Sequence, residues 1–156
     1  MIVLDDVLVP VDFSQPSCAA VAEAVAIADK FDATVHLLNV VTEPLDEMWS
    51  CYAPAGDFLA RVRQLQSEGC RRLQNLVAGR SGRRLVVSTV WGDPVTEILK
   101  YAAGHAVDMI VCGTHGRHGW NRLAMGSVAE NLVRRAPCPV LTVQSGASQA
   151  PELSAA

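Results

Sequence analysis

Short apolar runs alternate with helix-like segments along almost the whole chain. Five runs are rich in Val, Leu and Ile, and they lack the strict alternation of apolar and polar positions that marks a half-exposed strand. Continuous apolar runs of this kind predict strands that are buried on both faces. The predicted strands cover residues 7–12, 34–41, 85–90, 109–112 and 140–143.

Helical spacing of apolar residues marks the segments between these strands. Ser14 is placed to cap the first helix, with Pro16 in its first turn. Asp57 is a candidate cap for the second helix, and Asp93 followed by Pro94 is a typical start for the third. We therefore predict four helices, over residues 17–31, 57–79, 94–104 and 127–135, and a loop over 42–56.

Strands that alternate with helices in this way are typical of an α/β fold with a parallel sheet. Right-handed crossover connections place helices on both faces, which predicts a doubly wound, five-stranded domain with four helices. Such sheets bind ligands beyond the carboxyl ends of their strands, at the point where the strand order reverses. Candidate functional residues are therefore expected directly after residues 12, 41, 90 and 112.

Composition narrows the class of protein and its compartment. The chain of 156 residues suits one domain, and 50% hydrophobic with 19% charged residues is typical of a globular protein. A net charge of −3 disfavours a nucleic-acid partner, and no apolar run approaches the length of a membrane span. The N-terminus lacks the basic region of a signal peptide, and the five cysteines form no C-x-x-C pair. We expect a cytoplasmic protein with free thiols, a domain over 1–144 and a disordered tail over 145–156.

The most informative segment follows the fourth predicted strand. Gly113 and Gly116 belong to the sequence Gly-Thr-His-Gly, and after nine further residues Gly126 and Ser127 open the fourth helix. Glycines let a backbone approach a ligand closely, and a helix N-terminus attracts anions. Ser127 and Glu130 have the spacing of a capping box, so the alternative is that these residues form only turns and a cap. The spacing matches neither the Rossmann fingerprint nor a Walker P-loop.

Several segments together resemble the universal stress protein family. The sequence over 108–143 contains a G-x2-G-x9-G-[ST] spacing that is similar to the ATP-binding signature of that family. Segments 9–14, 38–41 and 92–94 resemble its first strand and turn, the end of its second strand and the start of its third helix. The resemblance extends over about residues 5–144. It implies the adenine-nucleotide alpha-hydrolase-like fold, with strand order 3-2-1-4-5 and an ATP site between the first and fourth strands.

The resemblance also implies roles for individual residues. Val40 would offer its backbone to adenine. Position 129 departs from members that have Thr there, because Ala129 lacks a hydroxyl for phosphate. The residues that would contact the remainder of ATP are Pro10, Val11, Asp12, Gly113, His115, Gly116, Arg117, Gly126, Ser127 and Val128.

Asp12 is the one carboxylate at the predicted switch point of the sheet. It is the candidate ligand for a Mg²⁺ ion that accompanies ATP. An aspartate after a strand is also a common turn or cap residue, and this alternative stays open. A single carboxylate without a Walker lysine disfavours efficient phosphoryl transfer. We therefore expect an ATP-binding regulatory module with slow hydrolysis or none, and turnover well below the ~10 s⁻¹ of a typical enzyme.

Other classes of function are weighed against this expectation. The H-x-G-H and S-G-G-x-D-S signatures of nucleotidyl-transfer enzymes on related folds are absent near the first strand. A dimeric protein-interaction module that needs no ATP remains an alternative, as does a weak ATPase. An exposed apolar edge strand favours pairing. The family resemblance and this rule together predict a homodimer built on Val140, Leu141, Thr142 and Val143.

Overall fold

The computed structural model of the chain describes residues 3–42, 55–79, 84–114 and 125–144. Most of the predicted loop over 42–56 and the whole predicted tail over 145–156 lie outside the described residues. All of the predicted strands and helices fall within the described ranges.

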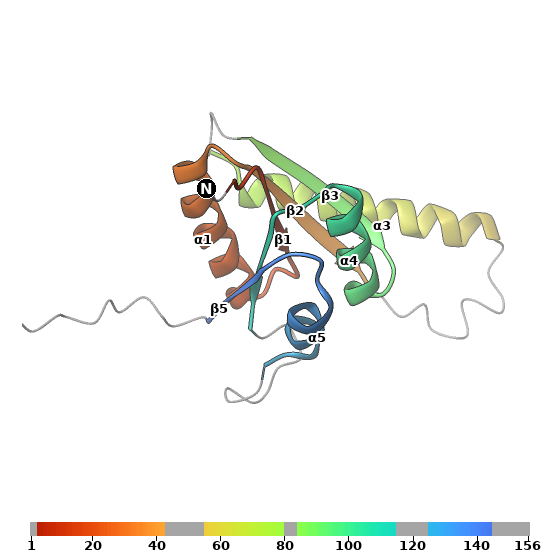
Figure 1. The fold of residues 1–156 in the computed structure, drawn as a ribbon. Helices are drawn as coiled ribbons and strands as arrows, with labels where there is room; N and C mark the ends of the chain where they lie inside the picture. Colours follow the sequence, from red (N-terminus) through yellow and green to blue (C-terminus); the bar gives the residue numbers. More distant parts are fainter. Residues whose placement is uncertain (1–2, 43–54, 80–83, 115–124, 145–156) are drawn as a thin grey trace, which may run out of the picture.

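Five parallel strands form one sheet in the order β3-β2-β1-β4-β5 (Figure 1). This arrangement confirms the predicted fold class and strand order. β1 is central, and Val7, Leu8 and Val9 are fully buried because neighbouring strands and helices cover them on every side. The strands are β1 (Asp6–Pro10), β2 (Thr34–Val41), β3 (Leu85–Trp91), β4 (Met109–Gly113) and β5 (Val140–Val143).

Helices cover both faces of the sheet. Successive side chains of a strand point to opposite faces, so Val7 and Val9 pack with α1 and α3 while Leu8 packs with α4 and α5. Both faces are thus apolar and buried, as the continuous apolar runs predict. The helices are α1 (Gln15–Phe31), α3 (Ala55–Leu76), α4 (Pro94–Gly104) and α5 (Ser127–Arg135).

Of the caps predicted for α1, α3 and α4, two are confirmed and one is wrong. The side chain of Ser14 accepts a hydrogen bond at the start of α1, and the side chain of Asp93 does the same for α4. α3 begins at Ala55, so Asp57 lies inside its first turn and is not the cap. An acidic residue favours a helix start from the first turn as well as from the cap, and the sequence alone does not separate these positions.

The turn between β1 and α1 begins earlier than predicted, because β1 ends at Pro10. The N–H of Val11 still donates to the carbonyl oxygen of Leu38 at 2.8 Å. The chain then turns through Phe13, whose φ of 64° lies in the left-handed region that few non-glycine residues adopt. The apolar run therefore continues past the end of the regular strand, and Asp12 belongs to the turn.

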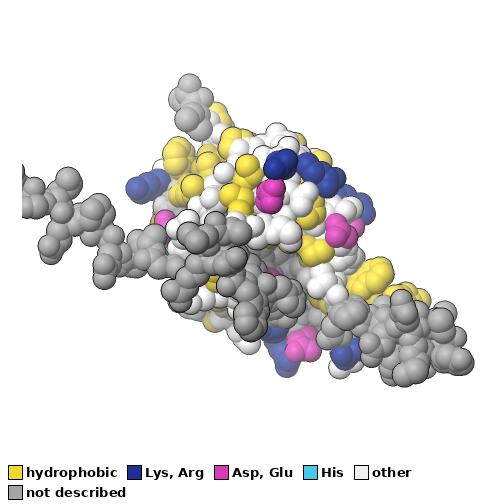
Figure 2. All heavy atoms as spheres, turned by 90° about the horizontal axis from the view of Figure 1, so that it is seen from below, with side chains coloured by type: hydrophobic (Ala, Val, Ile, Leu, Met, Phe, Trp, Pro, Cys, Tyr) yellow, Lys and Arg dark blue, Asp and Glu magenta, His cyan; other side chains and the backbone are white. Residues whose placement is uncertain are grey.

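Two features of the described residues concern a membrane or a nucleic-acid partner. None of the described helices is long and apolar enough to cross a membrane. Figure 2 shows acidic and basic side chains on the same described face, with hydrophobic side chains between them. A nucleic-acid protein would instead gather its basic side chains on one face.

α3 approaches the sheet most closely at Gly69. A Cβ atom on Gly69 would lie 2.6 Å from Cγ2 of Thr89 and 2.7 Å from Oδ1 of Asn39. Leu73, one turn further along, is fully buried. The first half of α3 extends beyond the strands (Figure 1), and Leu59, which the apolar stripe places in the core, is 52% exposed. The glycine therefore permits the close packing of the second half of the helix.

Gly69→Ala is expected to destabilise the protein, although alanine favours a helix interior over glycine by ~1 kcal/mol. The added methyl group overpacks two short side chains, and overpacking of a core costs about 1–3 kcal/mol. We expect a net loss of up to about 2 kcal/mol in the free energy of unfolding, measured by urea denaturation. The control is Gly104→Ala, because a Cβ there meets no atom within 4 Å. Equal stability of the two variants would contradict this prediction.

Candidate functional site

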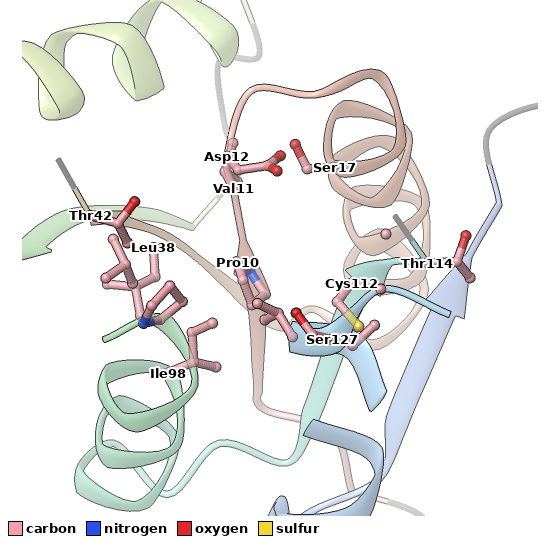
Figure 3. Close-up of a pocket in the computed structure, with 16 residues that line it drawn as sticks. Pro10, Val11, Asp12, Ser17, Leu38, Thr42, Ile98, Cys112, Thr114 and Ser127 are labelled. Atoms are coloured by element: carbon pink, nitrogen blue, oxygen red, sulfur yellow. The ribbon is translucent and has the colours of Figure 1, made fainter. Parts of the chain in front are cut away.

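A pocket of about 280 Å³ lies at the carboxyl ends of β1 and β4 (Figure 3). The strand order reverses at this point, since β2 and β3 lie on one side of β1 while β4 and β5 lie on the other. The position therefore agrees with the general rule for ligand sites in doubly wound sheets. The described lining residues are Pro10, Val11, Asp12, Ser17, Leu38, Val40, Thr42, Pro94, Ile98, Cys112, Gly113, Thr114, Gly126, Ser127, Val128 and Ala129.

The structure brings together every predicted site residue that it describes. They come from the ends of three strands and from the first turn of α5. Their common position is an observation, whereas what they bind stays a prediction. His115, Gly116 and Arg117 lie outside the described residues. The predicted residues in the pocket are Pro10, Val11, Asp12, Val40, Gly113, Gly126, Ser127 and Val128.

Several lining residues are absent from the predicted set. Thr42 and Thr114 directly follow β2 and β4, so their positions at strand ends were available as a signal. Leu38 lies on the same face of β2 as Val40, two residues away, which is the spacing of one strand face. The remaining ones are Ser17 on α1, Pro94 and Ile98 on α4, Cys112 on β4 and Ala129 on α5. Their contribution depends on how the helices pack around the sheet edge, which the local sequence does not show.

Asp12 closes the turn that leads into α1. Its Oδ1 atom accepts hydrogen bonds from the backbone N–H of Ser14 at 3.0 Å and from the hydroxyl of Ser14 at 2.5 Å. The turn alternative is therefore correct, and the same carboxylate lies at the pocket on the side of Ser17 (Figure 3). Asp12 is the one charged side chain among the described lining residues. Within the described ranges, no group of three or more His, Cys, Asp and Glu side chains forms a metal site.

The first turn of α5 forms another wall of the pocket. Its N-cap is Gly126, with φ of −61° and ψ of 149°, and among the described residues no side chain accepts a hydrogen bond at this cap. The predicted capping box is wrong, because Ser127 is already helical and Glu130 pairs with Arg134 at 2.9 Å. The N–H of Gly126 donates to the carbonyl oxygen of Thr114 at 2.6 Å, which holds the helix start against the end of β4. First-turn N–H groups have no partner within a helix, so the positive end of α5 is available at the pocket.

Gly113 lies where the first turn of α1 meets the end of β4. A Cβ atom there would lie 2.8 Å from the backbone carbonyl carbon and from Cβ of Pro16. Contacts this close to backbone atoms are not relieved by a side-chain rotation. The sequence assigns Gly113 to a turn, and the structure adds that this glycine lets two elements that line the pocket pack together.

Cys112 is a buried, apolar part of the pocket lining. It packs with Leu8, Ile110 and Leu132 in the core beneath α4 and α5. Burial raises the pKa of the Cys112 thiol to about 11. The thiol is therefore neutral at physiological pH.

These features define the class of protein: a doubly wound α/β domain with a pocket at its switch point. The profile of the universal stress protein family matches residues 4–144, and the chain belongs to that family. It is 32% identical over 146 residues to the universal stress protein MJ0531 of Methanocaldococcus jannaschii, covering 88% of this chain and 81% of that protein. The solved structure of UspA from Lactobacillus plantarum is 30% identical, with a TM-score of 0.74, over 92% of this chain and 99% of the other.

More distant structures with the same fold contain nucleotides. A universal stress protein in complex with cAMP is 22% identical, with a TM-score of 0.63, and covers 92% of this chain and 99% of that one. The universal stress protein from Archaeoglobus fulgidus in complex with dAMP is 18% identical, with a TM-score of 0.58 and the same coverage. At these identities the similarity shows a shared fold.

Cys112 should resist alkylation in the folded protein. With a pKa of about 11 and a buried side chain, almost no accessible thiolate exists at pH 8. Iodoacetamide treatment at pH 8, followed by peptide mass spectrometry, should leave Cys112 unmodified in the native protein and modify it after denaturation. The partly exposed Cys18 is the internal control and should react in the native state. Rapid native modification of Cys112 would show that the pocket floor is open and polar.

Proposed function

We propose that this universal stress protein binds ATP in the β1–β4 pocket and acts as a nucleotide-dependent regulatory module. The observation that carries the proposal is the start of α5. The side chains of Ser14 and Asp93 cap α1 and α4, whereas the N-cap residue of α5, Gly126, has no side chain to accept a hydrogen bond. Among these three helices, the start without a side-chain acceptor on its own N-cap residue is the one that follows the glycine signature, and a phosphate chain would supply acceptors there.

The shape of the pocket suits an adenine nucleotide. Leu38, Thr42 and Ile98 lie at one end of the pocket and Ser127 lies toward the other (Figure 3). The carboxylate of Asp12 points toward Ser17 of α1 (Figure 3). The apolar end would hold the adenine ring beside the backbone of Val40, and the α5 end would hold phosphates. The volume of about 280 Å³ in the described part is near the lower end of the about 300–1,000 Å³ range of ligand pockets. The cAMP and dAMP complexes support the proposal by showing that this fold accommodates adenine nucleotides.

Asp12 fits a supporting role toward Mg²⁺. Magnesium bound with nucleotides takes one or two carboxylates and obtains its other ligands from phosphate oxygens and water. Asp12 supplies one hard oxygen group at the pocket, which is consistent with that arrangement. When bound, the ion would neutralise phosphate charge.

A binding switch suits these residues better than an enzyme does. Efficient phosphoryl transfer requires several groups that orient the nucleophile and stabilise developing charge. The described lining contains a single charged side chain, Asp12, and two hydrogen bonds from Ser14 already engage it. ATP would therefore act by favouring one conformation of the protein over another, in proportion to its differential affinity. The proposed location of this switch is the cytoplasm, and its domain is residues 1–144.

Gly126→Val is expected to weaken ATP binding at least tenfold. The backbone of Gly126 is in the extended region, which valine adopts without strain, so the added side chain acts by occupying the pocket wall at the phosphate end. Isothermal titration calorimetry with Mg-ATP measures the change. Gly104→Val puts the same side chain at a helix end with no neighbour within 4 Å and should bind as the wild type does. Unchanged affinity in Gly126→Val would refute the assignment of phosphate to α5.

We further propose that β5 pairs two copies of the chain in a homodimer. β5 is an edge strand, and Leu141 in its middle is 40% exposed. Val133 on α5 is also exposed, at 51%. An uncovered apolar edge is an aggregation hazard unless a partner pairs with it. The same surface would serve the alternative of a protein-interaction module that needs no ATP.

Leu141→Lys is expected to shift the protein from dimer to monomer. A charged side chain in the middle of the paired edge would have to be buried without a partner. Analytical ultracentrifugation at micromolar concentration measures the mass in solution. The matched control is Val86→Lys on β3, the opposite edge of the sheet, where the native side chain is 39% exposed. That variant should remain dimeric, and a monomeric wild-type protein would rule out the β5 dimer.

A further inference from the structure

Asn39 is a buried polar residue directly behind the pocket. It lies in β2 between Leu38 and Val40, which line the pocket, but its own side chain points to the opposite face of the sheet. There it is 8% exposed and faces Gly69 of α3. A polar amide at a position where Val35 and Leu37 of the same strand face are apolar calls for a specific partner.

The partner of Asn39 is the turn that carries Asp12. The Nδ2 atom of Asn39 donates to the carbonyl oxygen of Val11 at 2.8 Å. The N–H of Val11 donates to the carbonyl oxygen of Leu38 at 2.8 Å. Both polar backbone groups of Val11 are therefore bonded to β2, which fixes the peptide plane from which Asp12 begins.

The conformation after Asp12 needs such support. Phe13 has a φ of 64°, and a non-glycine residue in this region carries backbone strain that its surroundings must compensate. The guanidinium of Arg72 on α3 lies 3.7 Å from the centre of the Phe13 ring, a favourable cation–π contact. Asn39 thus holds the carbonyl of Val11 and Arg72 holds the ring of Phe13. Both contacts stabilise the turn from the face opposite to the pocket.

We propose that Asn39 is a positioning residue for ligand binding, which orients Asp12 through the carbonyl of Val11. The inference rests on the proposed nucleotide site, in which Asp12 contacts the ligand. Asn39 itself lies outside the pocket lining, so its effect on affinity passes entirely through the turn. Removal of the amide leaves the Val11 carbonyl buried without its donor and allows the Val11–Ser14 turn to take other conformations.

A double-mutant cycle separates positioning from a general packing role. Asn39→Leu keeps the branched shape of the side chain but has no donor, and it should weaken Mg-ATP binding about tenfold in calorimetry. In an Asp12→Ala background the same change should have less than a twofold effect, because its route to the ligand is gone. The matched control is Thr89→Val at the register partner of Asn39, where the hydroxyl has no hydrogen-bond partner among the described residues. Thr89→Val should bind as the wild type does.

A second measurement needs no ligand. The N–H of Ser14 is bonded to Asp12 Oδ1, so its amide exchange reports on the turn. In Asn39→Leu the exchange of Ser14, relative to that of Ile110 in β4, should accelerate at least tenfold by NMR, and in Thr89→Val it should not. Asn39→Ala replaces Asn39→Leu if the latter does not fold.

The outcomes distinguish this inference from the proposed function. Absence of ATP binding in the wild type would refute the proposed function, and Ser14 exchange would then decide whether Asn39 orders the turn. Additive effects of Asn39→Leu and Asp12→Ala would overturn the positioning role, as would unchanged Ser14 exchange in Asn39→Leu. A coupled cycle together with accelerated exchange supports it.

Discussion

The pairing of β1 between β2 and β4 is the constraint on which the remainder of the structure depends. Val7 and Leu8 are in register with Val35 and His36 on one side and with Met109 and Ile110 on the other. The chain leaves β1 toward α1 on one face and leaves β4 toward α5 on the other face. Two adjacent strands whose chains depart to opposite faces leave a space between them, and the pocket occupies that space.

The helix starts at this edge differ in how their N–H groups are satisfied. α1 and α4 obtain an acceptor from a side chain of their own caps, Ser14 and Asp93. The cap of α5 is a glycine and provides none, although it leaves room for a ligand to approach. Helix dipoles of similar size point toward the same edge, so the starts of α1, α4 and α5 differ in their cap residue and not in their dipole. The glycine signature ends at the start whose cap residue has no side chain.

The sequence predicted the elements and the strand order well, because their signals are local and repeated. Apolar runs define β2 and β5 with the observed bounds, and Ser127–Arg135 is helical as predicted. The failures occur where tertiary packing overrides a local pattern. Ser127 has the spacing of a capping box, yet Thr114 fixes the helix start one residue earlier by accepting a hydrogen bond from the N–H of Gly126. The apolar stripe of α3 extends along the whole helix, but the sheet is too short to cover Leu59.

The candidate site was predictable in part: the sequence locates the strand ends, but it does not show which residues reach the site through tertiary packing. Residues at strand ends, such as Asp12 and Gly113, could be identified because the fold class places all carboxyl ends together. Residues that act from behind could not, since their role depends on a partner distant in sequence. The side chain of Asn39 bonds to Val11, which is 28 residues away in the sequence. Gly69 of α3 leaves room for Asn39, although α3 and β2 are separated by a predicted loop in the sequence. One strand, β2, thus supplies the pocket wall with Leu38 and Val40 and the support for the opposing turn with Asn39. A substitution on the α3 face of β2 would therefore alter the pocket without touching it.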